Sequence, residues 1–364
     1  LKKILKKLLK KEESILKINK HVNKNGTLLF AESLDRGAQG ILAKHSQSHY
    51  TPGTSKMWLQ IEPESATLKN TVKLSHLERV WWPEEGFTKG DIVAYYQEIA
   101  PLIIPYLVDR PQSLNRHPHG VHGESFFHKN MVGYLPPWIQ THKVSSKSSG
   151  RSINYLLCQD KESLLYMINM GCIELNPWLS RVGSLEYPDF CVIDLDPDDN
   201  PFSQVVEVAL KTHEILNHLS IPNFCKTSGA TGLHIVIPLT PNTPFEESRL
   251  FAWSVVQKIQ KIFPRITSIE RTPSKRRHKI YLDFLQNRKS QTLAAPYCIR
   301  PRKLATVSTP LAWSELTPSL HPSAFNLRTI SQRIAEKGDL WQETIKIQGV
   351  ELKNFVESSA LKDD

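Results

Sequence analysis

The sequence lacks several features that define common classes of protein. It has no apolar run of about 18 residues, the length that a transmembrane helix needs. Lysine recurs throughout the first 20 residues, which argues against a secretory signal peptide. The five cysteines among 364 residues are scattered and never form a Cys-x-x-Cys pair, so neither a disulfide framework nor a zinc site is indicated. We therefore expect a protein of a reducing compartment, without a membrane partner, whose cysteines are small buried hydrophobic residues.

What is present is an ordinary globular composition with an uneven positive charge. Hydrophobic residues make up 40% of the chain and charged residues 23%, and the length allows two domains or one large one. Lysine and arginine number 46 against 36 acidic residues, which gives a formal net charge of +10. Residues 1–24 hold nine lysines and two glutamates, so most of the excess lies at this end. The remainder favours local basic patches, for which nucleic acid is the natural partner.

The stretch YPDFCVIDLDP, residues 187–197, combines an apolar strand with two acidic residues. Phe190 to Leu195 is rich in β-branched residues, and Pro197 ends it. Asp194 and Asp196 are two positions apart, so a strand points both carboxylates to the same face. Two buried carboxylates side by side are costly without a cation, and Mg²⁺ or Mn²⁺ prefers such oxygen ligands. For this motif alone, a solvated Asp-Pro turn at a strand end is the alternative.

The elements around this stretch predict an α+β fold. Downstream we expect helices at residues 203–219 and 245–263. We expect strands at residues 224–227, 233–239, 280–285 and 297–300, and a small-residue loop at 228–232. The order β, α, β, β, α, β is that of a split βαβ (RRM-like) sheet with its helices on one side. Upstream we expect a helix that begins at Thr88 and Asp91, strands at 114–119 and 124–129, a polar loop at 142–151 and a helix at 164–175.

Polar residues gather at the ends of these elements. Three carboxylates stand on strand ends: Asp194, Asp196 and Asp283. In the loop Ser-Gly-Ala-Thr-Gly, residues 228–232, glycines let backbone N–H groups approach an anion, and hydroxyl groups and the imidazole of His234 complete a phosphate cradle. Arg276, in a basic loop at 271–279, and Arg300 are placed to pair with phosphate oxygens. Together these groups fit phosphoryl transfer assisted by two metal ions.

These motifs resemble, in order, those of a known family. DLDP (194–197), SGATGLH (228–234) and YLDFLQN (281–287) match the three motifs of the archaeo-eukaryotic primase superfamily. The runs LNRHPHG, FFHK, GCIELNPW and QTLAAPYCIRPR are similar to those of one of its members, the polymerase domain of bacterial DNA ligase D. The resemblance covers residues 74–310. It implies a primase-like catalytic domain, which we place at 74–348, followed by a C-terminal tail at 349–364.

The resemblance also implies roles for individual residues. Two divalent metals, with Mn²⁺ preferred and Mg²⁺ the other option, would be held by Asp194, Asp196 and Asp283. The incoming NTP or dNTP would contact Ser228, Thr231, His234, Arg276, Gln286 and Arg300. A 5′-phosphate on the DNA would meet His76, Arg79 and Lys89, and weaker candidates for contacts to the DNA backbone are Arg116 and Lys129. A template base would stack on Phe126 and Phe127.

Without the resemblance, the three candidate phosphate ligands would be solvated surface residues and the two phenylalanines core residues. Two positions of the nucleotide site depart from the family. It often has lysine where this chain has Thr231 and histidine where it has Asn176, so two possible cationic donors are absent. We therefore expect a lower nucleotide affinity. Asn176 and Trp178 are structural candidates as much as functional ones.

Residues 30–62 carry a second resemblance. QGILAK and KMWLQIE are similar to the last two strand motifs of the adenylation domain of ATP-dependent DNA ligases, but Gln39, Gln60 and Glu62 replace a glutamate and two lysines. A Lys-x-Asp-Gly motif occurs nowhere in the sequence, and without its amine the phosphoramidate of ligation cannot form. We expect residues 1–66 to be a degenerate ligase remnant, residues 67–73 to be a linker, and the chain to have no ligase activity.

The function that the first resemblance implies is nucleotidyl transfer in bacterial non-homologous end joining. The enzyme would extend a 3′-hydroxyl at DNA ends or gaps that carry a 5′-phosphate, with NTPs preferred, in the cytoplasm at the bacterial nucleoid and with Ku as a partner. The alternatives are a catalytically inactive DNA-end-binding remnant of a ligase D and a primase that starts chains de novo. The three carboxylates, His234 and the arginines are all present, which favours an enzyme over a remnant.

Overall fold

The structure, a computed structural model, describes a few short segments before residue 72 and most of the chain after it. The described residues are 29, 30, 33, 41–44, 58–61, 72–145, 150–353 and 355. The chain divides into two units, Leu1–Thr71 and Val72–Asp364. The second unit contains all the elements around the candidate site.

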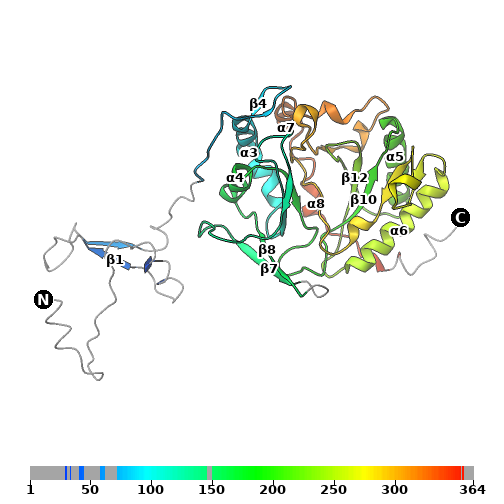
Figure 1. Cartoon of the computed structure of the whole chain (residues 1–364). Helices are drawn as coiled ribbons and strands as arrows, with labels where there is room; N and C mark the ends of the chain where they lie inside the picture. Colours follow the sequence, from blue (N-terminus) through cyan, green and yellow to red (C-terminus); the bar gives the residue numbers. More distant parts are fainter. Residues whose placement is uncertain are drawn as a thin grey trace, which may run out of the picture. The chain divides into compact units, whose positions relative to one another are not determined.

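In the first unit, β1 (Ile41–Lys44) and β2 (Trp58–Ile61) form an antiparallel pair in which Ile41 lies opposite Ile61 (Figure 1). These strands coincide with the two ligase-like motifs of the sequence. Residues 1–20 and most of the expected linker lie outside the described residues. The origin of this unit as a degenerate ligase fragment therefore stays a prediction.

The second unit begins with a layer of two helices and a small sheet. Its elements are β3 (Val80–Trp82), β4 (Phe87–Thr88), α3 (Lys89–Ile103), β5 (Gln112–Arg116), β6 (Phe126–His128), β7 (Thr141–Ser145), β8 (Ser152–Leu156), α4 (Lys161–Asn169) and β9 (Cys172–Pro177). The strand order of the small sheet is β6-β5-β9, and α3 packs against α4. Helix α3 starts as predicted: the Thr88 hydroxyl accepts from the Asp91 amide, and the Asp91 carboxylate accepts from the Thr88 amide.

The rest of the second unit is built on one six-stranded sheet. In spatial order its strands are β13 (Thr267–Ser268), β14 (Ile280–Asp283), β10 (Phe190–Asp196), β12 (Leu233–Pro238), β11 (Phe224–Thr227) and β15 (Pro310–Leu311). Only the β13–β14 pair is parallel among these. Helix α5 (Phe202–His218) connects β10 to β11, and α6 (Phe245–Ile262) connects β12 to β13. The predicted β, α, β, β, α, β order is therefore confirmed.

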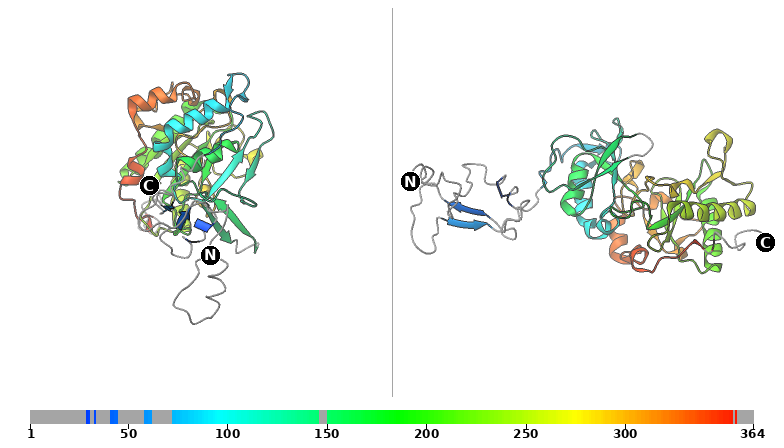
Figure 2. Two further views of the ribbon diagram at one scale, coloured as in Figure 1. Left: turned by 90° about the vertical axis from the view of Figure 1, so that its left-hand side faces the viewer. Right: turned by 90° about the horizontal axis from the view of Figure 1, so that it is seen from below.

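The alternation of side chains along β10 assigns the two faces of this sheet. Cys191, Ile193 and Leu195 are buried in one core together with the apolar sides of α5 and α6. Val192 points the other way, into the core of the first layer. Asp194 has the same parity as Val192, so it lies on the face opposite α5 and α6. The right-hand view of Figure 2 shows the two layers of the unit side by side.

Three elements differ from those expected. Helix α4 ends at Asn169, and Gly171, with a φ of +91°, turns the chain into β9 instead of a helix to residue 175. All of β9 is buried, so its sequence lacks the alternation that identifies a strand. The first part of the expected polar loop belongs to β7, which pairs with β8 directly after the loop, and the polar residues of this pair are partly exposed. Tyr297 has a φ of +65°, so the strand expected at 297–300 is irregular backbone, and β15 forms the edge.

The C-terminal part of the chain packs back on the sheet. Helices α7 (Ile330–Lys337) and α8 (Glu343–Lys346) are followed by a segment that pairs with the end of β12, where the Val350 amide donates to the Pro238 carbonyl at 2.9 Å. Leu352 is fully buried in the core that holds α5 and α6. The first residues of the expected tail thus belong to the packed unit. Within the described ranges, no helix combines the length and apolar character needed to cross a membrane.

Candidate active site

The three acidic residues of the sequence motifs meet on one face of the six-stranded sheet. Asp194 of β10 and Asp283 of β14 are direct partners in the antiparallel register. Side chains of such partners point to the same face with Cβ atoms about 5 Å apart. Asp196 follows two residues after Asp194, so it shares this face. The sequence spacing alone predicts that Asp194 and Asp196 share a face. The pairing of β10 with β14 brings Asp283 to the same place.

Burial disfavours the charged forms of these carboxyl groups. The Asp194 side chain is only 16% exposed, and burial, with the nearby charges of Asp283 and Asp196, raises its pKa to about 8. Burial also raises the pKa of Asp283 and of Asp196. The Asp196 side chain is 52% exposed and lies 4.0 Å from the Arg276 guanidinium, whose charge opposes this rise. The site thus holds three carboxyl groups whose ionised forms are disfavoured unless a further cation is present.

The chemistry of this donor set fits a hard divalent cation, which binds carboxylate oxygens and offsets their repulsion. The carboxylates do not yet face one centre. Asp196 approaches Arg276, and Asp283 accepts a hydrogen bond from the Leu285 amide at 2.7 Å. Accordingly, the described part of the chain contains no ready-made cluster of three His, Cys, Asp or Glu side chains able to hold a metal ion. Metal binding by the three aspartates stays a prediction that requires Asp196 to leave Arg276.

A row of polar side chains, the polar row, continues from the carboxylates across the sheet: Asp283, Asp194, His234 and Lys226. His234 Nε2 lies 3.5 Å from Asp194 Oδ1, and His234 Nδ1 lies 2.8 Å from Lys226 Nζ. Burial, together with the charge of Lys226, lowers the pKa of His234 well below its ordinary value, so the imidazole is neutral. Burial also lowers the pKa of Lys226, to about 7.

Lys226 was not among the residues singled out from the sequence. A signal for it exists, because Lys226 interrupts the otherwise apolar Phe-Cys-Lys-Thr strand β11 at the parity that faces the site. Cys225, its neighbour, points to the opposite core. A lysine inside a short buried strand is unusual enough to indicate a specific partner.

The small-residue loop 228–232 closes tightly beside the polar row. The Ser228 hydroxyl accepts hydrogen bonds from the backbone amides of Ala230 at 3.1 Å and Gly232 at 3.0 Å. Gly232 has no room for a side chain, because a Cβ there would lie 2.0 Å from the Leu195 carbonyl oxygen. Thr231 is exposed at the tip of the loop. The loop therefore has the fixed, close-approach backbone that an anion cradle needs.

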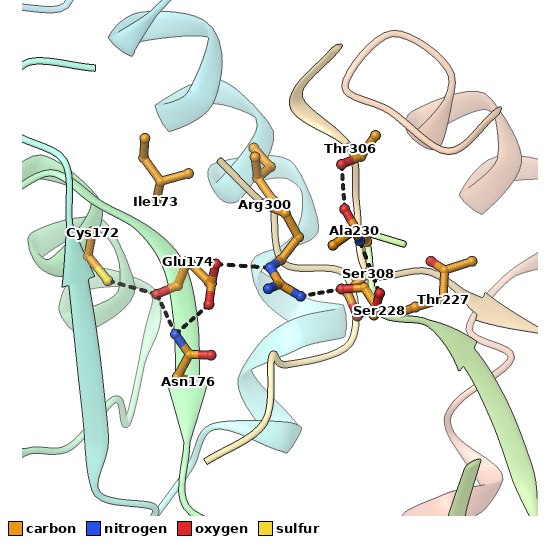
Figure 3. A network of polar contacts seen from close by, with 12 residues as sticks. Cys172, Ile173, Glu174, Asn176, Thr227, Ser228, Ala230, Arg300, Thr306 and Ser308 are labelled. Atoms are coloured by element: carbon orange, nitrogen blue, oxygen red, sulfur yellow. Dashed lines mark hydrogen bonds and ion pairs between the residues drawn. The ribbon is translucent and has the colours of Figure 1, made fainter. Parts of the chain in front are cut away.

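Arg300 connects this loop to β9 of the first layer (Figure 3). Its Nε donates to Glu174 Oε2 at 2.9 Å, and its Nη1 donates to the Ser228 carbonyl. The buried Glu174 carboxylate also accepts from the side-chain amide of Asn176 at 3.0 Å, so the Asn176 side chain points to Glu174. Sequence reasoning assigned no role to Glu174. Its carboxylate links the predicted nucleotide ligand Arg300 to the neighbouring sheet.

Arg276 and Gln286 lie around the carboxylates. The Arg276 guanidinium stacks 3.9 Å from the centre of the Tyr281 ring, and Gln286 Nε2 is 3.4 Å from Asp283 Oδ2. Arg276 Nη1 and Gln286 Oε1 are buried polar atoms without a hydrogen-bond partner among the described residues. Such atoms are costly unless a ligand or solvent meets them, which fits a role in binding.

The candidate 5′-phosphate residues lie in the first layer. His76 and Arg79 are exposed, whereas Lys89, at the start of α3, is buried. Lys89 Nζ donates to the Ser75 carbonyl, the Asn169 carbonyl and the Asn169 Oδ1, each at 2.8 Å. These three acceptors match the three N–H donors of an ammonium group. Lys89 is thus a structural cross-link here, and its contact with phosphate stays a prediction.

Phe126 and Phe127 lie on the edge strand β6 and are exposed to 47% and 62%. The guanidinium of Arg116 lies 5.2 Å from the Phe126 ring, and the Lys129 ammonium lies 6.0 Å from the Phe127 ring. The alternative that both are core residues is therefore wrong. Exposed aromatic rings next to cations suit stacking on nucleic-acid bases, although their contact with a template stays a prediction.

Comparison with known proteins accounts for this arrangement. The family model described as "LigD, primase-polymerase domain" matches residues 88–341. The chain is 30% identical over 287 residues to the "Bifunctional non-homologous end joining protein LigD" of Bacillus subtilis, which covers 78% of this chain and 46% of that protein. It is 29% identical over 273 residues to the "Multifunctional non-homologous end joining protein LigD" of Mycolicibacterium smegmatis, which covers 74% of this chain and 35% of that protein.

A solved structure, "Polymerase Domain from Mycobacterium tuberculosis Ligase D in complex with DNA", is similar with a TM-score of 0.70 and 28% sequence identity. The similarity covers 77% of this chain and 99% of that one. The chain thus spans less than half the length of the two curated relatives and almost the whole of the solved polymerase domain. The family model covers well over half of the chain. The chain therefore belongs to the family of LigD primase-polymerase domains.

Proposed function

We propose that the chain is a template-directed nucleotidyltransferase that extends a 3′-hydroxyl at DNA ends and gaps bearing a 5′-phosphate, with NTPs preferred over dNTPs. The observation that carries this proposal is the register of the sheet, which places Asp283 and His234 on either side of Asp194. The similar domain from Mycobacterium tuberculosis is described as a polymerase domain in complex with DNA, which supports it. The names of the curated relatives suggest non-homologous end joining as the process. Ku as the partner is part of this proposal and is not named in them.

In this proposal Asp194, Asp196 and Asp283 hold two divalent metal ions, Mn²⁺ or Mg²⁺. Such ions lower the pKa of an attacking hydroxyl and offset the charge of a leaving pyrophosphate. Burial and the neighbouring aspartates raise the pKa of Asp194, and a bound cation would favour its ionised form. Arg276 turns from Asp196 towards the triphosphate, which releases the third carboxylate.

The loop 228–232, His234 and Arg300 bind the triphosphate in this proposal. Ser228 accepts two backbone hydrogen bonds, so its own O–H is the part that donates outward. Arg300 uses Nε and Nη1 for Glu174 and the loop, and a guanidinium with five N–H donors retains others for phosphate oxygens. The neutral imidazole of His234 donates from one nitrogen, so it contributes a hydrogen bond and no charge.

The DNA lies along the first layer, with a template base stacked on Phe126 or Phe127 and phosphates near Arg116 and Lys129. Residues His76, Arg79 and Lys89 receive the 5′-phosphate. No ligation step is proposed, because the sequence has no Lys-x-Asp-Gly motif to supply a nucleophile.

Primer extension on gapped DNA with Mn²⁺, with and without a 5′-phosphate in the gap, tests the proposal. We expect template-dependent incorporation by the wild type and a loss of at least about a thousandfold in Asp283→Asn, because a metal ligand contributes several kcal/mol to the transition state. Asp199→Asn is the matched control: Asp199 pairs with His278 on an exposed loop outside the polar row. Equal activity of Asp283→Asn and Asp199→Asn would refute the assignment.

The same experiment separates the two alternative functions. Binding of DNA ends without incorporation by any form, the wild type included, indicates an inactive end-binding remnant. Products that start without a primer on single-stranded template indicate a primase. Incorporation only from an annealed primer supports the proposed extension activity.

A further inference from the structure

Lys226 is a buried cation directly behind the candidate nucleotide site. Its side chain is 1% exposed, and it borders an apolar cavity together with Val192, Val236 and Trp341. An ammonium group in such surroundings is costly unless it is fully used in hydrogen bonds. A lysine at this position therefore needs a specific acceptor.

Two acceptors meet the ammonium group. Lys226 Nζ lies 2.8 Å from His234 Nδ1 and 2.6 Å from Ser308 Oγ. The Ser308 hydroxyl donates its own proton to the Thr227 carbonyl at 2.9 Å, so it accepts from Lys226. In its ammonium form Lys226 has donors and no acceptor, so His234 Nδ1 then accepts from it. The imidazole proton is then carried by Nε2.

This tautomer matters because Nε2 is the nitrogen of His234 that faces the candidate site. Nε2 lies 3.5 Å from Asp194 Oδ1, on the face that holds the carboxylates, and the loop 228–232 precedes the strand of His234. A neutral imidazole carries one ring proton, and only the Nε2–H form presents a donor to this side. In the other tautomer Nε2 would present a lone pair to this side, which phosphate oxygens repel.

We propose that Lys226 is a positioning residue for nucleotide binding: by donating to His234 Nδ1 it fixes the imidazole in the Nε2–H tautomer that faces the triphosphate. This inference rests on the proposed nucleotidyltransferase function. Lys226 does not touch the substrate in this view, and it acts only through His234. A purely structural role would be filled equally well by an apolar chain of the same length, such as methionine.

The test compares Lys226→Met with the wild type by two measurements. In metal-free protein labelled with ¹⁵N at histidine, the ring nitrogen shifts report the tautomer of His234, whose signals are assigned from a His234→Gln variant. In the second measurement, the affinity for a fluorescent NTP is determined with Mn²⁺. We expect Lys226→Met to lose the uniform Nε2–H signature and to bind the NTP about tenfold more weakly, as for the loss of a well-placed hydrogen bond.

Two further variants make the test specific. Ser308→Ala removes the other acceptor of Lys226 and should leave the tautomer unchanged. In a His234→Gln background, Lys226→Met should cause no additional loss of affinity, because its only route to the nucleotide is gone. An additional tenfold loss in that background would show direct or structural action and would overturn the proposal.

The result for the wild type separates this inference from the proposed function. If the wild type neither binds nor incorporates NTPs, the proposed function fails and the role of Lys226 in nucleotide binding fails with it. If the wild type is active but Lys226→Met keeps the Nε2–H signature and full affinity, the Lys226 inference alone fails. An unfolded Lys226→Met protein, seen as collapsed amide dispersion, would show a structural role and would also reject the inference.

Discussion

Replacing Asp194 by asparagine should abolish nucleotide incorporation and yet stabilise the metal-free protein. Burial and two neighbouring aspartates raise the pKa of Asp194 from 3.8 to about 8. At about 1.4 kcal/mol for each pH unit between these values, ionisation in the folded state costs on the order of 5 kcal/mol. Because a buried asparagine amide also needs hydrogen-bond partners, we expect roughly half of this as a gain in stability at pH 8.

The sign of the pH dependence follows from proton binding. The folded state keeps the Asp194 proton up to about pH 8, whereas the unfolded chain releases it near pH 4. Between these values the folded state binds more protons, so the wild type loses stability as the pH rises through this window. Asparagine does not titrate, so Asp194→Asn should be less stable than the wild type at pH 4, where the Asp194 cost is absent, and more stable at pH 8.

Thermal unfolding in EDTA, followed by circular dichroism at pH 4, 6 and 8, measures this difference. For a unit of this size a gain of about 2.5 kcal/mol corresponds to a rise in Tm of about 5 °C. Added Mn²⁺ should raise the Tm of the wild type and leave that of Asp194→Asn nearly unchanged. A lower Tm of the variant at pH 8, or a difference independent of pH, would refute the conclusion that burial beside two other carboxyl groups disfavours the ionised form of Asp194.

Two further predictions concern residues whose contacts the structure reveals. Glu174→Gln should raise the KM for NTP about tenfold, because Arg300 loses its charged anchor. Glu315→Gln breaks a similar arginine–glutamate pair that does not include Arg300, and it should leave the KM unchanged; primer-extension kinetics compare the two variants. Lys89→Met should lower the stability by about 1–3 kcal/mol in thermal unfolding, because three acceptors lose their donor, and should weaken binding to 5′-phosphorylated ends more than to unphosphorylated ends. Arg79→Met should weaken only the binding, and equal losses on both kinds of end would reject the phosphate pocket.

Much of the six-stranded sheet could be predicted because the sequence patterns that indicate its elements are local. The parity of Asp194 and Asp196, the loop 228–232 and the amphipathic helices α5 and α6 each follow from a few neighbouring residues. The pairing of Asp194 with Asp283 depends on strand order across many residues. Only the resemblance to a family predicted that the two would act together, and the register then showed them to be partners. The proposed roles of these residues as ligands still need the experiments above.

What the sequence did not reveal depends on contacts between distant segments. Glu174 lies in β9, a strand whose uniform burial hides its periodicity, and its partner Arg300 lies more than a hundred residues later. Lys226 looks like a surface lysine until its strand is placed between β12 and β15. The exposure of Phe126 and Phe127 depends on their edge position in a three-stranded sheet, which composition does not predict.

The polar row owes its geometry to the apolar face behind it. Ile193 and Ile235 are partners in the β10–β12 register, and both point into the core with α5 and α6. A slip of one residue would move them to the polar side and would bury Asp194 or His234 among the helices, at a cost of several kcal/mol. Gly232 adds a steric constraint, since its backbone fits against the Leu195 carbonyl only in this register. The hydrophobic core therefore aligns the candidate catalytic groups, and a substitution such as Ile235→Ser should disturb the site without touching any ligand in it.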